Sequence, residues 1–203
     1  MIVVIDYGMG NTGSLHNMVR KAGGASEISS DLSTITRATK LILPGVGSFD
    51  NGMKKLKETG IADVLNKRVC EDKIPILCIC LGIQLITLCS EEGTLPGFGW
   101  IKAETIRFKF SSELNLRIPH MGWNTVVQKK ASPLLLGLQE ESRFYFVHSY
   151  HVNCANKEDV LTTTTYGIEF VSSIQHENIF ATQFHPEKSH KFGLNLIKNF
   201  VEL

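Results

Sequence analysis

Short runs of consecutive apolar residues constrain the fold of this chain more than any other feature. The first three lie at residues 2–5, 41–43 and 76–79 and are mostly isoleucine, valine and leucine. Strands of a parallel sheet show this pattern when helices cover both faces of the sheet. Segments with helical patterning lie between the runs, at 14–22 and 53–70. The pattern therefore predicts βαβ repetition and an α/β fold.

The middle of the chain, from residue 93 to about 171, has a different character. Short β-rich pieces separated by Gly, Pro and Asn occur at 102–110, 125–128, 143–152 and 160–166. They predict an antiparallel or mixed sheet that extends the parallel one. A strand at 179–184 and a closing helix at about 191–201 follow.

The sequence contains no internal repeat, low-complexity stretch or interdomain linker. We therefore expect residues 1–203 to form a single α/β domain. Its core would be a central, mostly parallel sheet with flanking helices and an additional antiparallel or mixed portion.

Composition excludes several classes of protein. The 203 residues include 21 Lys+Arg and 20 Asp+Glu, for a net charge of +1, whereas nucleic-acid binders normally carry a clustered basic excess. The longest apolar run, at 74–83, is far shorter than the roughly 20 residues of a membrane span, and no positive charge precedes the first apolar run as in a secretory signal. Five irregularly spaced cysteines suit reduced thiols. We expect a cytoplasmic protein without a metal site or a cofactor.

The candidate nucleophile is Cys80. The strand at 76–79 leads into Cys80, and a helical pattern follows, which is the arrangement of a nucleophile elbow. The helix N-terminus would favour a thiolate there. Gly82 supplies one of the small residues that such an elbow needs, but Cys78 stands where a second glycine is expected. The alternative is that Cys78, Cys80 and Cys89 are small buried hydrophobic residues.

A candidate base lies near the end of the chain. His185 and Glu187 are two positions apart, so in an extended segment their side chains point the same way. Pro186 biases His185 away from a helical conformation. Glu187 could then fix the tautomer of His185, which would act as base toward a thiol. Taken alone, the segment could also be a surface turn.

The residues after the strand at 41–43 could bind an oxyanion. Gly45, Val46 and Gly47 allow backbone N–H groups to turn toward a ligand. A simple tight turn is the alternative. The segment is not a phosphate loop, because no Lys-Ser/Thr pair follows at the required position.

Taken together, these motifs resemble the class I, triad-type glutamine amidotransferase family. The resemblance is carried by Cys-x-Gly-x-Gln at 80–84, Pro-Gly-Val-Gly at 44–47 and Phe-His-Pro-Glu at 184–187. Within that family, Asp-Tyr-Gly-Met-Gly-Asn at 6–11 and Pro-His-Met-Gly-Trp-Asn at 119–124 resemble the glutaminase subunits of imidazole glycerol phosphate synthase. The resemblance extends from residue 2 to the final helix and implies the family's fold.

The resemblance also implies an activity, the hydrolysis of L-glutamine to glutamate and ammonia. Cys80 would form a glutamyl thioester, His185 would protonate the leaving ammonia and then activate water, and Glu187 would hold His185. Residues that would bind the oxyanion or the substrate are Gly45, Val46, Gly47, Leu81, Gln84, Ser149 and Tyr150.

Finally, the resemblance implies a partner. Free ammonia is largely protonated at neutral pH, so the family passes it directly to a second active site, here a (β/α)₈ cyclase subunit in histidine biosynthesis. Residues matching positions that face this partner are Asn11, Met121, Trp123, Tyr145 and Lys188. For Met121 and Trp123, a local aromatic core is the alternative.

Three other functions remain open at this level. A paralogue could supply ammonia for surface-polysaccharide sugars, because the glutaminase residues do not contact the acceptor. The chain could also be a catalytically silent partner-binding domain, or a thiol hydrolase that acts alone. Cys78 and Gly13 mildly raise the weight of a paralogue, and the intact set of Cys80, His185 and Glu187 argues against a silent domain.

Overall fold

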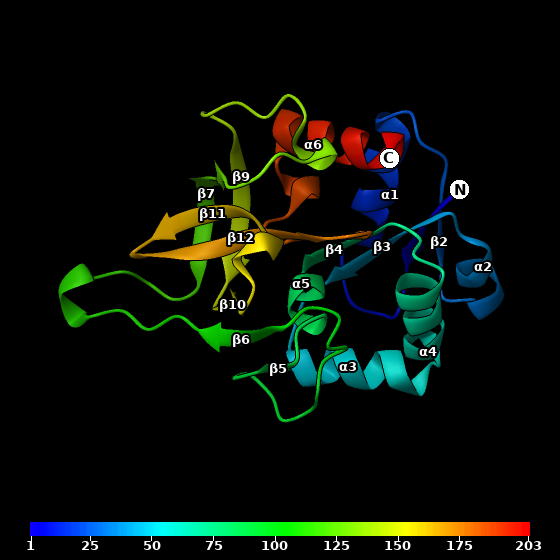
Figure 1. Cartoon of the computed structure of the whole chain (residues 1–203), viewed down its shortest axis with the longest axis horizontal. Helices are drawn as coiled ribbons and strands as arrows, with labels where there is room; N and C mark the ends of the chain where they lie inside the picture. Colours follow the sequence, from blue (N-terminus) through cyan, green and yellow to red (C-terminus); the bar gives the residue numbers. More distant parts are fainter.

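Five parallel strands form one half of a large sheet in a computed structural model that describes residues 1–203 (Figure 1). Their spatial order is β2 (Ser26–Ser29), β1 (Ile2–Ile5), β3 (Lys40–Gly45), β4 (Ile76–Cys80) and β13 (Ile179–Thr182). Every residue of β1, β4 and β13 is buried, as expected for strands covered on both faces. The predicted α/β fold is confirmed.

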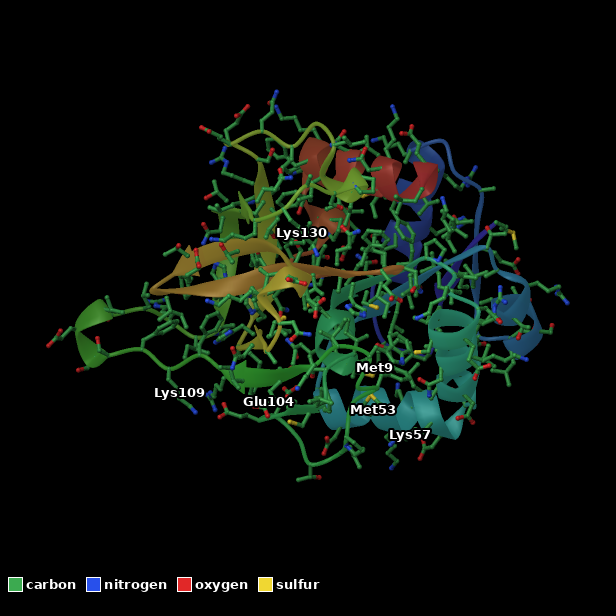
Figure 2. The ribbon with its side chains drawn as sticks, in the orientation of Figure 1. Met9, Met53, Lys57, Glu104, Lys109 and Lys130 are labelled. Atoms are coloured by element: carbon green, nitrogen blue, oxygen red, sulfur yellow. The ribbon has the colours of Figure 1, made fainter.

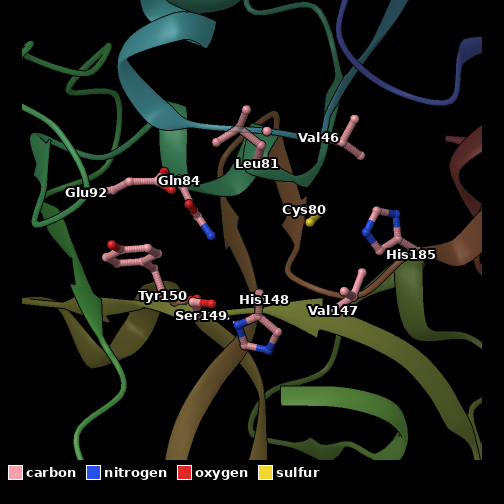
Figure 3. A pocket seen from close by; sticks show the side chains of 11 residues that line it. Val46, Cys80, Leu81, Gln84, Glu92, Val147, His148, Ser149, Tyr150 and His185 are labelled. Carbon is pink, nitrogen blue, oxygen red and sulfur yellow. Dashed lines mark hydrogen bonds between the residues drawn. The ribbon is translucent and has the colours of Figure 1, made fainter. Parts of the chain in front are cut away.

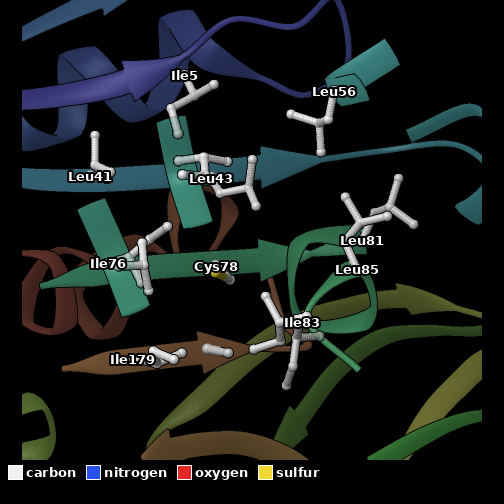
Figure 4. Packing of buried hydrophobic residues seen from close by; sticks show 14 of the residues in the cluster. Ile5, Leu41, Leu43, Leu56, Ile76, Cys78, Leu81, Ile83, Leu85 and Ile179 are labelled. Carbon is white, nitrogen blue, oxygen red and sulfur yellow. The ribbon is translucent and has the colours of Figure 1, made fainter. Parts of the chain in front are cut away.

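Helices cover both faces of this sheet. α1 (Thr12–Lys21) and α6 (His190–Glu202) lie on one face (Figure 1), where Leu15 and Phe200 belong to one buried apolar cluster. The remaining helices belong to the other face and are α2 (Leu32–Arg37), α3 (Phe49–Glu58), α4 (Ile61–Asn66) and α5 (Leu81–Leu85). Figure 4 shows Leu56, Leu81 and Leu85 in the buried cluster on this face, which also contains Leu43. No helix combines the length and apolar character needed to cross a lipid bilayer.

The predicted mixed portion extends the sheet beyond β13. β12 (Ile168–His176) pairs with β13 in antiparallel orientation, and the order continues through β10 (Tyr150–Cys154), β6 (Ala103–Arg107) and β5 (Cys89–Ser90). β11 (Val160–Tyr166) and β8 (Val127–Gln128) form a branch on β12. A separate two-stranded antiparallel sheet contains β7 (His120–Thr125) and β9 (Arg143–His148). Figure 2 shows the side chains of the same view, with Glu104 on β6 and Lys130 just after β8 in this part of the chain.

Three predicted elements are wrong in their extent. The piece expected at 125–128 contains the last residue of β7, Thr125, and the separate short strand β8. The helix expected at 53–70 is two helices, because Gly60 adopts a left-handed conformation (φ 73°) that ends α3 and allows α4 to start in a new direction. A π-helical turn (Lys67–Glu71) follows α4. The strand expected at 143–152 is also two strands, which separate at Ser149 and join different sheets.

Candidate active site

The candidate nucleophile lies on a strained turn between β4 and α5. Cys80 is the last residue of β4 and has φ 55° and ψ −104°, a conformation that residues other than glycine rarely adopt. The turn is tight, because a Cβ atom on Gly82 would collide with the carbonyl oxygen of Leu43. Only glycine fits at position 82, as the elbow interpretation requires.

Cys78 lies on the other face of the sheet from Cys80. It is fully buried in the same apolar cluster as Ile76 and Leu81, and Figure 4 shows it within this packing, whereas Cys80 belongs to the cluster of the opposite face. Burial raises the pKa of the Cys78 thiol far above its usual range. Cys78 is therefore a core residue, and its thiol is unreactive.

Replacing Cys78 with alanine is expected to leave glutamine turnover within about twofold of the original chain. The loss of a buried sulfur atom should lower the free energy of unfolding by roughly 1 to 2 kcal/mol. Urea denaturation and a glutamate-release assay measure the two effects. A loss of turnover as large as that caused by removing Cys80 would assign Cys78 a chemical role.

His185 and Glu187 follow β13 and form a buried pair. The imidazole Nδ1 lies 2.8 Å from the Glu187 Oε1, and each side chain is only 2% exposed. Because a carboxylate accepts the Nδ1 proton, Nε2 is left for chemistry, and this buried atom has no hydrogen-bond partner. The ring faces the Cys80 sulfur (Figure 3). Burial opposes a charge on His185, but the interactions with Cys80 and Glu187 outweigh it and raise its pKa to about 10.

The backbone of His185 is fixed by Ser189, a residue that the sequence analysis missed. The His185 N–H donates to the Tyr145 carbonyl (2.9 Å), the Tyr145 N–H donates to Ser189 Oγ (3.0 Å), and Ser189 Oγ donates to the His185 carbonyl (2.6 Å). Ser189 is fully buried. These bonds join the end of β13 to β9 and hold the candidate base in place.

Most of the predicted site residues line one cavity of about 280 Å³ (Figure 3). The cavity is lined by Val46, Gly47, Cys80, Leu81, Gln84, Glu92, Val147, His148, Ser149, Tyr150 and His185. Gly45 and Glu187 are not among these lining residues: Gly45 packs beside Leu81, and Glu187 contacts the imidazole of His185. The cavity lies where β3, β4 and β13 end, the usual ligand position in an open parallel sheet.

The loop after β3 carries free backbone donors. The N–H groups of Val46 and Gly47 make no hydrogen bond within the chain. The N-terminal loop at 6–11 packs closely against this segment: a Cβ atom on Gly10 would lie 2.8 Å from the Pro44 Cβ, and the Tyr7 hydroxyl donates to the Pro44 carbonyl at 2.8 Å. The N-terminal motif therefore supports the candidate oxyanion loop.

Comparison with known proteins identifies the family. The model of the family described as Glutamine amidotransferase class-I matches residues 3–203. The chain belongs to this family. Its curated relatives include the "Imidazole glycerol phosphate synthase subunit HisH 2" of Methanococcus maripaludis, 54% identical over 100% of this chain and 99% of the relative. The protein of the same name from Pseudomonas aeruginosa is 48% identical over the full length of both chains.

Solved structures show the same fold at lower identity. PurLQS from Thermotoga maritima is 16% identical with a TM-score of 0.74, and 99% of this chain and 97% of that chain are covered. A second structure, described as a glutamine amidotransferase, is 19% identical with a TM-score of 0.68, and 97% and 99% are covered. The predicted amidotransferase fold and the resemblance to synthase subunits are confirmed.

Two further residues of this amidotransferase contact the site and were not predicted. Glu92 is the only carboxylate that lines the cavity, and its Oε2 accepts the Phe49 N–H at 2.8 Å. Gln183 is fully buried, with its Nε2 3.9 Å from the Cys80 sulfur. Its Oε1 accepts from Gln84 at 3.3 Å. In the sequence, Glu92 lies in the family-like segment at 90–93 and Gln183 next to the motif at 184–187, but neither residue shows a role there.

Among the predicted partner-facing residues of the amidotransferase, Tyr145 lies beside the candidate base, and Trp123 and Lys188 lie beside Tyr145. Trp123 packs edge-on against Tyr145 with ring centroids 6.1 Å apart, and the Lys188 Nζ lies 5.6 Å from the Tyr145 ring centroid. Met121 shares a face of β7 with Trp123, and these side chains are 61% and 44% exposed. Asn11 is exposed at the start of α1. The exposure of Met121 and Trp123 argues against a local aromatic core.

Two buried histidines pair at the cavity wall of the amidotransferase: His148 lines the cavity, and His120 lies behind it. His148 Nδ1 is 2.6 Å from the Tyr150 carbonyl, and His148 Nε2 is 3.0 Å from His120 Nδ1. Burial lowers the pKa of His120 to about 4. Burial, with the neighbouring charges of His120, His151 and His185, lowers the pKa of His148 to about 3 despite the bond to Tyr150. Both rings are therefore neutral at physiological pH.

Stability is expected to fall as the pH decreases from 6.5 to 5. In this window the unfolded chain binds protons on His120 and His148, whose ordinary pKa is 6.5, and the folded chain does not. The contribution of each histidine to this slope should rise from about 0.7 kcal/mol per pH unit at pH 6.5 toward about 1.4 kcal/mol per pH unit near pH 5. His185 does not affect the pH dependence of stability in this window. Its pKa is raised in the folded chain, so it changes the free energy of unfolding only above pH 6.5. Urea denaturation at several pH values measures this slope, and a flat profile would contradict it.

Proposed function

We propose that the chain is the glutaminase subunit of an imidazole glycerol phosphate synthase, with Cys80, His185 and Glu187 as its catalytic residues. It hydrolyses L-glutamine to glutamate and ammonia and supplies the ammonia to a cyclase subunit. The observation that carries this proposal is the geometry of the cavity, in which a cysteine on a strained elbow faces a histidine held by a buried carboxylate. Family membership supports it.

The first half-reaction forms a thioester. His185 takes the thiol proton of Cys80, and the thiolate attacks the side-chain carboxamide carbon of glutamine. The C=O electron pair moves onto oxygen, which the N–H groups of Leu81 and of the loop at 45–47 stabilise. When the tetrahedral intermediate collapses, the C–N bond breaks and His185 Nε2 gives its proton to the nitrogen, which leaves as ammonia.

The second half-reaction returns the enzyme to its starting state. Neutral His185 takes a proton from water, and the resulting hydroxide attacks the thioester carbon. The C–S bond then breaks, His185 returns its proton to the Cys80 thiolate, and the new γ-carboxylic acid loses its proton to solvent as glutamate leaves. Glu187 keeps the Nδ1–H tautomer throughout, so Nε2 remains the atom that accepts and donates the proton.

The remaining cavity residues bind the amino-acid part of glutamine. Glu92 offers a carboxylate to the α-ammonium group. The Ser149 N–H makes no hydrogen bond within the chain, so it can donate to the α-carboxylate beside Tyr150. Gln84, one helical turn after Cys80, can hydrogen-bond the substrate as well.

The partner is a (β/α)₈ cyclase subunit that binds the face containing Asn11, Met121, Trp123, Tyr145 and Lys188. Two exposed apolar side chains on one face of β7 suit a protein interface. The chain acts as a single cytoplasmic domain of this heterodimer and needs no cofactor.

Covalent trapping tests the proposed function. A glutamine analogue with a diazoketone in place of the carboxamide should alkylate Cys80 alone, and peptide mass spectrometry identifies the labelled residue. Free L-glutamine should protect Cys80, whereas L-asparagine should not. Labelling of the exposed Cys89 at the same rate would remove the support for an activated Cys80. Purification with a cyclase and identification of the acceptor it aminates would separate the histidine pathway from a paralogous one.

A further inference from the structure

A chain of side-chain hydrogen bonds runs from β7 to the wall of the cavity. Asn124 Nδ2 lies 3.3 Å from His120 Nε2, His120 Nδ1 lies 3.0 Å from His148 Nε2, and His148 Nδ1 lies 2.6 Å from the Tyr150 carbonyl. His120 and His148 are 3% and 5% exposed. We call these two residues the histidine relay.

The Asn124 end sets the direction of the relay. The Asn124 Oδ1 accepts the Thr125 N–H at 2.9 Å, and Nδ2 donates to the Thr165 carbonyl at 3.0 Å. These two bonds fix the orientation of the amide, so Asn124 presents an N–H to His120. His120 Nε2 must therefore accept, and the proton of the neutral ring lies on Nδ1.

The Tyr150 end requires the same direction independently. A carbonyl oxygen only accepts, so His148 Nδ1 must carry a proton. His148 Nε2 is then free to accept the proton of His120 Nδ1, as the Asn124 end demands. An additional proton on either ring would place two N–H groups against each other, so the hydrogen bonds and the burial together require two neutral Nδ1–H tautomers.

We propose that His148 and His120 are positioning residues that hold Ser149 and Tyr150 in the conformation that binds glutamine; this proposal rests on the function proposed above. Two bonds fix this segment, because the Phe108 N–H holds the Ser149 carbonyl at 3.1 Å and the His148 Nδ1–H holds the Tyr150 carbonyl. The Ser149 N–H is thereby left free at the cavity. The relay also connects this segment to β7, whose opposite face contains Met121 and Trp123.

The tautomers themselves provide the first test. Long-range ¹H–¹⁵N spectra of the unsubstituted chain distinguish Nδ1–H from Nε2–H histidine. We expect His120 and His148 to show the Nδ1–H pattern from pH 7 to pH 5.5. An Nε2–H or doubly protonated ring at either position would overturn the relay, whatever the function of the chain.

Glutamine affinity provides the second test. In a Cys80→Ala chain, where hydrolysis is blocked, calorimetry measures the Kd for L-glutamine. His148→Leu should weaken binding about five- to tenfold, the range of one lost hydrogen bond. His148→Asn should recover part of this loss, because its Nδ2–H can replace the imidazole Nδ1–H.

His151→Leu is the matched control. His151 is also buried and packs on Phe108 with ring centroids 4.7 Å apart, but its Nδ1 has no hydrogen-bond partner. The His151→Leu substitution should leave the Kd for L-glutamine unchanged. Equal weakening by His148→Leu and His151→Leu would overturn the positioning role. If the Cys80→Ala chain with both histidines intact binds no glutamine, the proposed function and the positioning role are both overturned. The tautomer spectra would still report whether the relay exists.

Discussion

Replacing Cys80 with alanine is expected to abolish measurable glutamine hydrolysis, with a loss of about 10³- to 10⁶-fold in turnover. The Cys80 sulfur is the only nucleophile at the elbow that faces His185 (Figure 3). Without it no thioester forms, and the remaining oxyanion donors can act only on direct attack by water. Glutamate release in the presence of the partner and its ligand is the measurement.

The fold should tolerate this substitution. Alanine keeps the Cβ atom and the backbone conformation of residue 80, so the far-UV circular dichroism and partner binding should not change. Cys89→Ala is the matched control, because Cys89 is an exposed thiol outside the cavity. Near-normal turnover in the Cys80→Ala chain would show that another group attacks glutamine.

The isolated chain is expected to be a poor glutaminase that a cyclase partner holding its acceptor ligand activates about 10²- to 10³-fold. This is the effect of gaining or losing one oxyanion donor. The loop at 45–47 has free N–H groups and a glycine at φ 109°, so its peptides can reorient. Asn11 directly follows Gly10, which packs on Pro44, so a partner that contacts Asn11 can move this loop.

Turnover of the free chain, of the complex, and of the complex with acceptor ligand tests this activation. The KM for glutamine should change less than kcat, because the donors act on the oxyanion and not on the amino-acid part of the substrate. Substitution of Trp123 by alanine should weaken the partner effect without altering the free chain. Equal kcat in all three states would instead support a hydrolase that acts alone.

The parallel half of the fold could be predicted from the sequence because its strands are apolar at consecutive positions. β1, β3, β4 and β13 are all of this kind. β2 was missed because its residues, Ser26–Ser29, are mostly polar at the sheet edge. β12 was missed because serine and glutamine interrupt its apolar positions, although Ser172 and Ser173 are fully buried and hydrogen-bonded to Thr162.

The candidate site was predictable where its chemistry lies in short motifs. Cys80, His185 and Glu187 each stand in a recognisable local pattern. The parallel pairing of β4 with β13 brings these patterns together. Ser189 and the histidine relay could not be found in this way. Their roles depend on hydrogen bonds between segments far apart in the chain, such as His120 with His148 and Ser189 with Tyr145.

The position of β13 has a consequence for the nascent protein during synthesis. β13 is the last strand to leave the ribosome, yet it pairs with β4, which is synthesised about a hundred residues earlier. A growing chain can therefore form the elbow with Cys80 long before it contains His185 or Glu187. Pairing between such distant segments is also slow, because loop closure must precede it. On the proposed mechanism, any chain that terminates before residue 185 lacks its base and cannot hydrolyse glutamine.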